Sequence, residues 1–366
     1  MKNQRNYQLD FLKLIFTGCV FLSHTHALIN KNTNFYIPTG LGWISVHFFF
    51  VLSGMLMVDS FMRKSNIQNN DESGKAALSY VLKKFQYLAI PYWVALILRT
   101  LIQIILYAKN PKTVNQIIFR MFPEIFAVNG GGILPQINNP PNWYISAMLI
   151  VMLPLYYLMA KKTDFFVHVF APLGAILTFG WMFSKKPHLS ELEFQTYFNG
   201  AVIRAFAGIC FGVIAWLIFD RLRKGIIKKP QRILISLIEI ISWSIFFSVI
   251  LQKEQWYVLE YSVMLLLPIT IAIAFSEKSY LAKLFHLKIF RWVAPLSLAI
   301  YLNHSGAVQI TIKYFRNLGY KKGVLISAVL TMVLCLLYFG IIKFFRVLWN
   351  RKLKKYFTNG EQKIEE

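Results

Sequence analysis

Acidic residues and cysteines are scarce in this chain. Its 366 residues include 16 Asp and Glu against 40 Lys and Arg, which gives a formal net charge of +24. Cys19, Cys210 and Cys335 have neither the spacing of a metal site nor that of an obvious disulfide, and we interpret them as packing residues. No close cluster of Cys, His and Asp has the spacing of metal ligands, so we predict no metal site.

Other absences exclude further classes of protein. The Gly130–Gly132 triplet lacks the following Lys and the strand-to-helix context of a nucleotide-binding loop. No repeat of about 20–50 residues stands out, and no long Pro, Ser or Gly linker divides the chain. We therefore expect a single domain over residues 1–350, followed by a short basic and polar tail, 351–366.

Apolar side chains, in contrast, are abundant. Hydrophobic residues make up 56% of the chain and its mean hydropathy is +0.49, which is too apolar for an ordinary water-soluble surface. A helix needs about 20 apolar residues to cross about 30 Å of hydrocarbon. We therefore predict an all-α polytopic membrane protein. Ten stretches have the required length: 11–29, 41–62, 88–107, 143–160, 165–183, 200–219, 233–251, 260–275, 293–312 and 323–345.

The distribution of basic residues predicts the orientation. With the N-terminus inside, the inner segments hold about 25 Lys and Arg and the outer ones about 11, so we expect both termini in the cytoplasm of a cell-membrane protein. The connection 220–232 and the segment 351–357 contribute most of this bias. They are typical of anchors against anionic headgroups, and no nucleic-acid partner is needed to explain the charge.

The first span differs from a signal peptide. It contains Asp10, Lys13 and two histidines, and it lacks a small-residue cleavage pattern, so we expect it to stay attached. The longest outer connection, 108–142, ends in VNGGGILPQINNPPN, whose glycines and prolines disfavour regular helix. This segment either caps a cavity or is a plain surface loop. We assign no chemistry to the inner loop 63–75.

Charged and polar residues inside the first span are informative because they are costly in a bilayer. Lys13 and His24 are eleven residues apart, which is three helical turns plus about 20°, so both lie on one face about 16 Å apart. Asp10, three residues before Lys13, is placed to pair with it. His26 points about 200° away from His24 and is a bystander.

His24 has two interpretations from its residue type alone. Imidazole is a general base near neutral pH and can take a proton from an alcohol that attacks an acyl carbon. A histidine hydrogen-bonded to a neighbouring helix is the alternative. Arg99, near the middle of the third span, must face a cavity, a carboxylate or an anionic ligand, or serve as a hydrogen-bonding hub between helices.

Two motifs carry a resemblance to a known family. YQLDFLKLIFTGCVFLSH, 7–24, has a Leu-Asp pair, a basic residue and then a histidine, and HFFFVLSGMLM, 47–57, has a Ser-Gly step at Ser53 and Gly54. Both are similar to motifs of the acyltransferase 3 family of multispanning membrane proteins, many of which O-acylate cell-surface glycans. The family often has Arg where this chain has Lys13.

Four later motifs follow in the family's order. YVLKKFQYLAIPYW, 80–93, resembles a stretch with paired basic residues, although Tyr87 stands where the family has a further Arg. Three further stretches resemble the remaining family motifs: PPNWYISAMLIVMLPLYYL, 140–158, NGAVIRAFAGICFGVIAW, 199–216, and PLSLAIYLNHSG, 295–306. The matched positions in these motifs are Lys83, Lys84, Pro91, Tyr92, Trp143, Tyr144, Arg204, Ser297, Ile300, Tyr301, Leu302 and His304.

The resemblance implies a membrane O-acyltransferase that takes an acyl group, most often acetyl, from a cytoplasmic acyl-CoA such as acetyl-CoA. His24 is then the catalytic base or acyl carrier, with Lys13 as its electrostatic partner and Asp10 holding Lys13. The expected acyl-donor residues are Lys83, Lys84, Arg99 and Ser53. The expected substrate-binding or structural residues are Trp143, Tyr144, Arg204, Tyr301 and His304.

The implied acceptor is a hydroxyl of a cell-surface carbohydrate or a lipid-linked glycan, and no bound cofactor is expected. After the last span we expect no esterase-like domain, because only about 20 mostly polar residues remain. Two other classes stay open. A transporter or flippase for lipid-linked saccharides would use Lys13, Arg99 and Arg204 to line a path, and a glycan polymerase or ligase would need larger outer loops.

Overall fold

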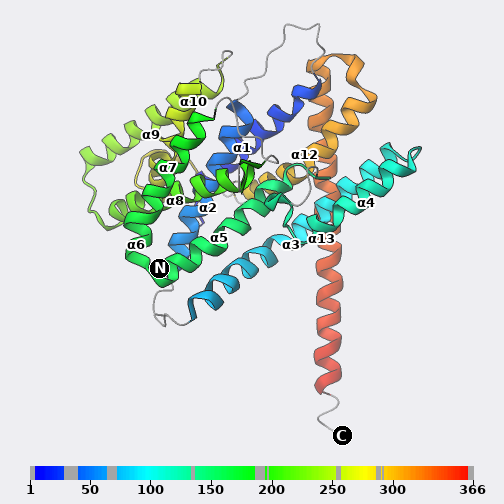
Figure 1. Cartoon of the computed structure of the whole chain (residues 1–366), viewed down its shortest axis with the longest axis horizontal. Coiled ribbons are helices and arrows are strands. Elements are labelled where there is room, and N and C mark those ends of the chain that lie inside the picture. Colours follow the sequence, from blue (N-terminus) through cyan, green and yellow to red (C-terminus); the bar gives the residue numbers. More distant parts are fainter. Residues whose placement is uncertain are drawn as a thin grey trace.

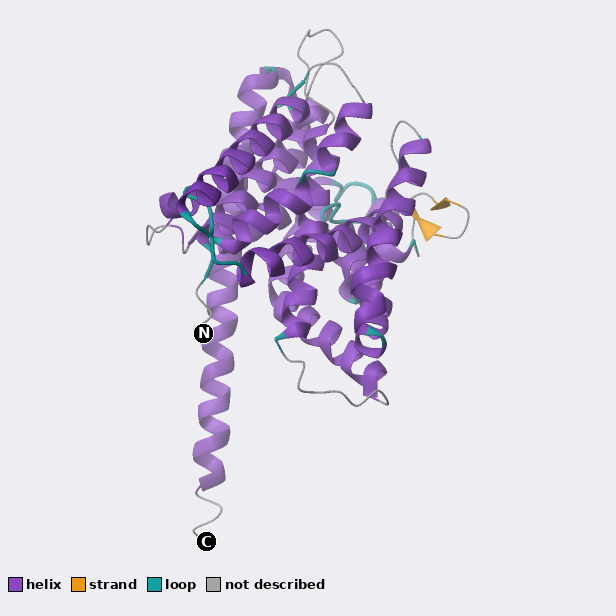
Figure 2. Cartoon of the chain, turned by 90° about the vertical axis from the view of Figure 1, so that its left-hand side faces the viewer, coloured by secondary structure: helices purple, strands orange, loops and turns teal. Residues whose placement is uncertain are grey.

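The computed structural model describes residues 5–28, 40–63, 72–132, 137–185, 194–195, 198–252, 257–285, 290 and 292–361. Helices dominate these residues, which confirms the predicted all-α class (Figure 1). Two very short antiparallel strands, β1 (Phe194–Gln195) and β2 (Phe198–Asn199), lie at one side of the molecule (Figure 2).

Nine helical segments of the described part of the chain are long and apolar enough to cross a membrane. Each corresponds to one of the predicted spans, so the chain is a multi-pass membrane protein. Their helices are α1 (Tyr7–His24) with η1 (Thr25–Leu28), α2 (Gly40–Met62), α3 (Ser73–Leu106), α5 (Asn142–Lys161), α6 (Thr163–Phe165) with η4 (Phe166–Phe170) and α7 (Ala171–Ser184), α8 (Gly200–Lys224), α9 (Lys229–Ile250), α10 (Tyr257–Met264) with α11 (Leu267–Ser276), and α13 (Tyr320–Glu361).

The tenth predicted span, 293–312, is also a helix, α12 (Val293–Tyr314), but it is less apolar than these nine. Its middle contains Asn303, His304 and Ser305, all of them buried. The helix packs against α1, α3 and α13. Because protein surrounds these polar side chains, α12 needs less apolar surface than a helix that faces lipid.

Two helices extend beyond their predicted spans. α3 has 34 residues and is therefore about 50 Å long, more than the thickness of the hydrocarbon core. α13 continues through residue 361 and projects from the body of the molecule (Figure 1). Hydropathy locates the apolar centre of such a helix, whereas its ends are set by backbone hydrogen bonds that persist in water.

The outer connection 108–142 contains a helix that the sequence analysis did not predict. α4 (Pro111–Ile125) begins after Asn110, whose side chain accepts a hydrogen bond from the Thr113 backbone N–H at 3.1 Å. Its side toward the protein includes the buried residues Ile117 and Glu124. Among the described residues between α4 and α5, a short helical turn, η3, spans Asn129–Gly131. The remaining short helical turns are η5 (Leu281–Phe285) and η7 (Arg316–Leu318).

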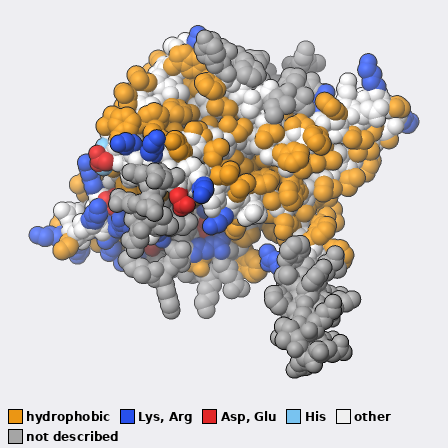
Figure 3. Space-filling view, turned by 60° about the horizontal axis from the view of Figure 1, so that its bottom comes forward, with side chains coloured by type: hydrophobic (Ala, Val, Ile, Leu, Met, Phe, Trp, Pro, Cys, Tyr) orange, Lys and Arg blue, Asp and Glu red, His pale blue; other side chains and the backbone are white. Residues whose placement is uncertain are grey.

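The surface agrees with a membrane location. Hydrophobic side chains cover a broad area of the face seen in Figure 3, and Lys and Arg side chains gather toward one edge. Large apolar side chains such as Ile97 and Ile105 on α3 and Leu336 on α13 are exposed. Lipid would cover such a surface in a multi-pass protein. The three cysteines are free, and Cys210 and Cys335 are buried.

Glycines allow α2 and α8 to approach very closely. A Cβ atom added at Gly54 of α2 would lie 2.2 Å from the backbone oxygen of Ile209, and one at Gly212 of α8 would lie 2.3 Å from that of Val51. Gly54 therefore serves the close packing of the two helices.

Gly54→Ala is expected to destabilise the protein by about 1–3 kcal/mol or more, because backbone atoms cannot yield to the added methyl group. Gly18→Ala in α1 is the matched control, since nothing lies within 4 Å of a Cβ there. Thermal unfolding of the detergent-solubilised variants measures the difference. An equal melting temperature for both variants would show that the α2–α8 contact is not tight.

Candidate active site

Two histidines from distant parts of the chain meet where α1 ends. His24 is the last residue of α1, and His304 lies in the middle of α12. The His304 Nε2 atom is 3.3 Å from the His24 Nδ1 atom, and the ring centroids are 4.9 Å apart. We call His24 and His304 the histidine pair. The sequence motifs contained both residues, but their contact spans 280 positions and had no local signal.

Backbone carbonyls fix the tautomers of the histidine pair. His24 Nδ1 is 2.9 Å from the Val20 oxygen, and His304 Nδ1 is 2.8 Å from the Tyr301 oxygen. A carbonyl oxygen can only accept a hydrogen bond, so both Nδ1 atoms carry a proton. His24 Nδ1–H is then shared between the Val20 oxygen and His304 Nε2, and the lone pair of the neutral His24 ring lies on Nε2.

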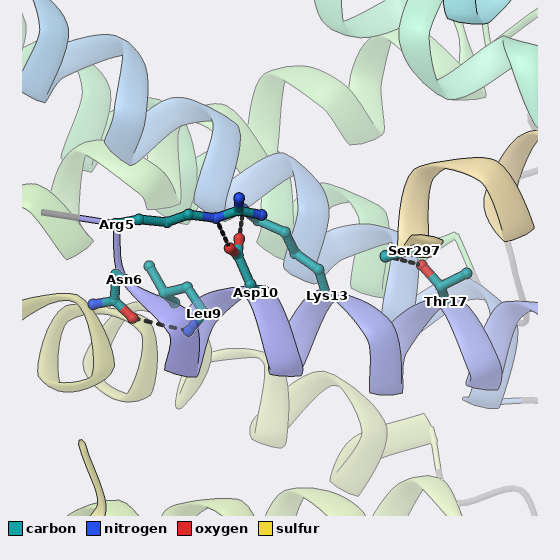
Figure 4. A network of polar contacts seen from close by, with 7 residues as sticks. All are labelled: Arg5, Asn6, Leu9, Asp10, Lys13, Thr17 and Ser297. Carbon is teal, nitrogen blue, oxygen red and sulfur yellow. Dashed lines mark hydrogen bonds and ion pairs between the residues drawn. The ribbon is translucent and has the colours of Figure 1, made fainter. Parts of the chain in front are cut away.

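The two rings differ in accessibility. His24 is exposed, whereas His304 is 0% exposed. A hydrogen bond of 2.8 Å between Thr17 and Ser297 joins the same two helices two turns away (Figure 4). One imidazole of the pair is therefore accessible from outside the protein, and the other is buried behind it.

Asp10 and Lys13 form the predicted ion pair, with 3.0 Å between Lys13 Nζ and Asp10 Oδ1. Arg5, which the sequence analysis did not single out, binds the second Asp10 oxygen at 2.5 Å (Figure 4). We call Arg5, Asp10 and Lys13 the Asp10 cluster. Three helical turns, about 16 Å, separate Lys13 from His24, so the lysine does not contact the catalytic candidate.

The adjacent lysines of α3 face in different directions. Lys84 is half-buried and close enough to Lys13 for mutual electrostatic repulsion. Lys83 is exposed, and so is Tyr87, the residue at the position where the related family has Arg. Lys84 therefore extends the positive charge of the Asp10 cluster, whereas Lys83 does not face it.

Arg99 lies away from these lysines. It is 15 residues beyond Lys84 on α3, which corresponds to about 22 Å along the helix. Its Nη1 atom donates to Gln309 Oε1 of α12, and its charge interacts with His304 and Glu124. The expected donor-binding set is thus divided, with Lys84 near the Asp10 cluster and Arg99 near the histidine pair.

Ser53 and two of the predicted tyrosines form one side of the site. Ser53 Oγ is 3.0 Å from the Tyr144 hydroxyl. This hydroxyl donates to the Phe49 oxygen at 3.1 Å. The rings of Tyr144 and Tyr301 are 5.9 Å apart, and Tyr301 lies 6.2 Å from His304. Residues from α2, α5 and α12 thereby connect Ser53 to the histidine pair.

Arg204 and Trp143 also lie together, in a second polar cluster. The Arg204 guanidinium is 5.0 Å from the centroid of the Trp143 ring and donates to the Trp43 oxygen at 3.1 Å. Trp43 Nε1 in turn donates to Glu260 at 3.2 Å. Cation–π contact and hydrogen bonding stabilise the buried arginine there. Trp43 and Glu260 were not predicted, since neither belongs to the matched motifs.

Sequence reasoning missed Glu124 as well. It is the sole acidic residue of the connection 108–142, which is the signal that singles it out. The carboxylate is completely buried beside Arg99 and the asparagines that precede α5. Within the described residues, no group of three or more His, Cys, Asp or Glu side chains is placed to hold a metal ion.

The fold and the histidine pair define a multi-pass membrane protein with a candidate acid–base site. A family model described as an acyltransferase domain matches residues 6–342, nearly the whole chain. The chain belongs to the acyltransferase 3 family. No curated protein and no solved structure gives a significant match.

Proposed function

We propose that this protein is a membrane O-acyltransferase with His24 at its catalytic centre. It moves an acyl group, most often acetyl, from a cytoplasmic acyl-CoA to a hydroxyl of a cell-surface or lipid-linked carbohydrate. The observation that carries the proposal is the 3.3 Å contact of the histidine pair in a chain of an acyltransferase family. An exposed imidazole backed by a buried one is a suitable acid–base unit for acyl transfer.

The donor side of the proposal rests on the spacing along α1. Lys84 and Lys13 supply positive charge for the phosphates of the acyl-CoA, and Asp10 holds Lys13 in place. The pantetheine arm of coenzyme A separates its phosphates from the thioester. About 16 Å of helix likewise separates Lys13 from His24, so one extended donor would reach both.

The proposed chemistry uses both histidines. His24 Nε2 takes the proton of the acceptor hydroxyl, the oxygen attacks the thioester carbonyl, and the C–S bond breaks. The leaving thiolate receives the proton from the imidazolium, which gives free coenzyme A. His304 Nε2 accepts from His24 Nδ1–H throughout and stabilises the charged ring. A second route passes through an acyl-imidazole on His24, and both routes need the same residues.

The distribution of basic residues supports an orientation of the protein in the membrane. Their excess in the segments predicted to be internal supports cytoplasmic termini and a plasma-membrane location. The Asp10 cluster, near the start of α1, then faces the cytoplasmic donor. His24, at the other end of α1, lies toward the outer face, from which a carbohydrate hydroxyl would approach.

Lys84→Ala is expected to raise KM for acyl-CoA by about 10-fold with little change in kcat, because a phosphate loses one charged contact. Lys83→Ala is the matched control and should stay within about 2-fold, since that exposed lysine does not face the Asp10 cluster. Initial rates at varied acyl-CoA concentration provide both constants. Equal effects of the two substitutions would argue against a donor site beside Lys84.

Labelled acetyl-CoA added to membranes that contain the protein tests the proposed function. The expected result is label in a lipid or glycan fraction, absent from membranes without the protein. Unlabelled acyl-CoAs of other chain lengths, added as competitors, identify the acyl group. Translocation of a lipid-linked saccharide without any use of acyl-CoA would instead support a transporter.

A further inference from the structure

The end of α4 holds a carboxylate that the mechanism above does not use. Glu124 is 0% exposed and lies outside the spanning helices. It accepts hydrogen bonds from the backbone N–H of Asn138, from that of Asn139 at 3.3 Å, and from Asn142 Nδ2 at 3.2 Å. We call these four residues the Glu124 cluster. Three donors on one buried carboxylate fix the segment 138–142 against α4.

The opposite side of this segment binds α12. Asn139 Nδ2 donates to the Leu302 oxygen at 3.0 Å, and Ser305 Oγ donates to Asn139 Oδ1 at 2.7 Å. These two residues of α12 lie on either side of His304 in the sequence. Asn139 is itself 0% exposed, so water does not compete for these bonds.

The hydroxyl of Tyr301 adds a third bond between the same two elements. The hydroxyl donates to the Pro141 oxygen at 3.2 Å, and the backbone oxygen of Tyr301 accepts a hydrogen bond from His304 Nδ1. Each of these three hydrogen bonds therefore involves a residue of α12 within three positions of His304, and one of these residues, Tyr301, also binds the His304 ring. A shift of this segment would move the carbonyls and side chains that orient the buried imidazole.

We propose that Glu124, acting through Asn139, is a positioning residue for the histidine pair. It holds the segment 138–142 so that Asn139 fixes the turn of α12 carrying His304, and His304 then orients His24. Glu124 touches neither histidine and no reacting atom. The role in catalysis rests on the proposed acyl transfer, whereas the role in fixing α12 does not.

The charged surroundings of Glu124 predict a dependence on pH. Arg99 and Tyr92 of α3 face it, the asparagines of 138–142 are neutral, and His304 of α12 lies beyond Arg99. Burial raises the pKa of Glu124 to about 7, although its three donors oppose the shift. Protonation places a hydrogen on a carboxyl oxygen that, in the ionised form, accepts a hydrogen bond. Because the buried carboxyl takes up this proton at a higher pH than a solvated one would, linkage makes the closed arrangement of the segment 138–142 more stable, not less, as pH falls through about 7.

Glu124→Gln tests the proposal, because an amide group then faces donors that need an acceptor. Glu239→Gln is the matched control, since Glu239 is equally buried but binds Gln8, 2.6 Å away, in another part of the membrane domain. Carbethoxylation of the histidines in the purified protein, mapped by mass spectrometry at fixed pH, reports on local structure without any substrate. The exposed His26 and His168 serve as internal references.

His304 should react at least about 5-fold faster in Glu124→Gln than in wild type, with the two reference histidines unchanged. Acyl transfer should show a kcat about 10-fold lower and a KM for acyl-CoA within about 2-fold of wild type. Glu239→Gln should match wild type in both assays. Asn139→Ala, which keeps Glu124 but removes its link to α12, should reproduce the faster His304 reaction.

The two assays separate the two proposals. Unchanged His304 protection in both Glu124→Gln and Asn139→Ala would overturn the positioning role, whatever the transfer assay shows. Faster His304 reaction together with no transfer by wild type would keep that role and overturn the acyltransferase proposal. A variant in which His47, a buried histidine of α2, also becomes reactive is unfolded, and the other variant then decides.

Discussion

Replacing His24 by alanine is expected to lower kcat for acyl transfer by about 10²–10⁴-fold, the range that general acid–base groups contribute. The proposed reaction has no other group at the His24 position to take the hydroxyl proton. KM for acyl-CoA should change little, because Lys13 of the Asp10 cluster lies about 16 Å away along α1 and Lys84 is near Lys13 rather than His24. Initial rates with labelled acyl-CoA measure both constants.

His26→Ala is the matched control for this prediction. His26 is exposed and lies two residues further on in η1, whereas the contact with His304 is made by His24. It should keep its activity within about 2-fold of wild type. Comparable losses in the two variants would mean that the terminal turn of α1, rather than the His24 imidazole, is required.

Replacing His304 by alanine is expected to lower kcat by about 10²-fold, with His24 still present. The substitution removes one of the two acceptors of His24 Nδ1–H and leaves the Val20 oxygen, so the ring loses its side-chain partner and the stabilisation which that partner gives to its charged form. The loss should be smaller than that of His24→Ala, because the reacting imidazole remains. Combining both substitutions should cost little more than His24→Ala alone, because the two residues act as one unit.

Ser297→Ala provides the control for His304. It removes the 2.8 Å bond between α12 and Thr17 of α1 but lies two turns from His304. If Ser297→Ala and His304→Ala reduced kcat equally, the contact between the helices would matter and the imidazole of His304 would not. A fully active His304→Ala variant would remove this residue from the mechanism.

Local features of the chain were predictable from the sequence. Apolar runs located the helices, and the i, i+3 spacing of Asp10 and Lys13 predicted their ion pair because it depends only on helical geometry. A small residue such as Gly54 permits the close approach of a neighbouring helix, which is what α2 and α8 show. In each case the interacting atoms lie on one helix, or the small residue itself is the cause.

Contacts between distant segments were not predictable in this way. The histidine pair joins the end of α1 to the middle of α12, and no spacing rule connects positions 280 apart. Arg99 was grouped with Lys83 and Lys84 by charge, although about 22 Å of helix divides it from Lys84. α4 was not predicted because its apolar residues are interspersed with polar ones and form no apolar run long enough to cross a membrane.

The most direct test of the account is a mass balance on purified protein in proteoliposomes with labelled acetyl-CoA and a carbohydrate or lipid-linked acceptor. The account predicts that each mole of label entering the acceptor is accompanied by one mole of free coenzyme A thiol, and that both products vanish in His24→Ala while His26→Ala forms them normally. Acceptor that crosses the bilayer unmodified while the thioester stays intact, equally in both variants, would contradict it.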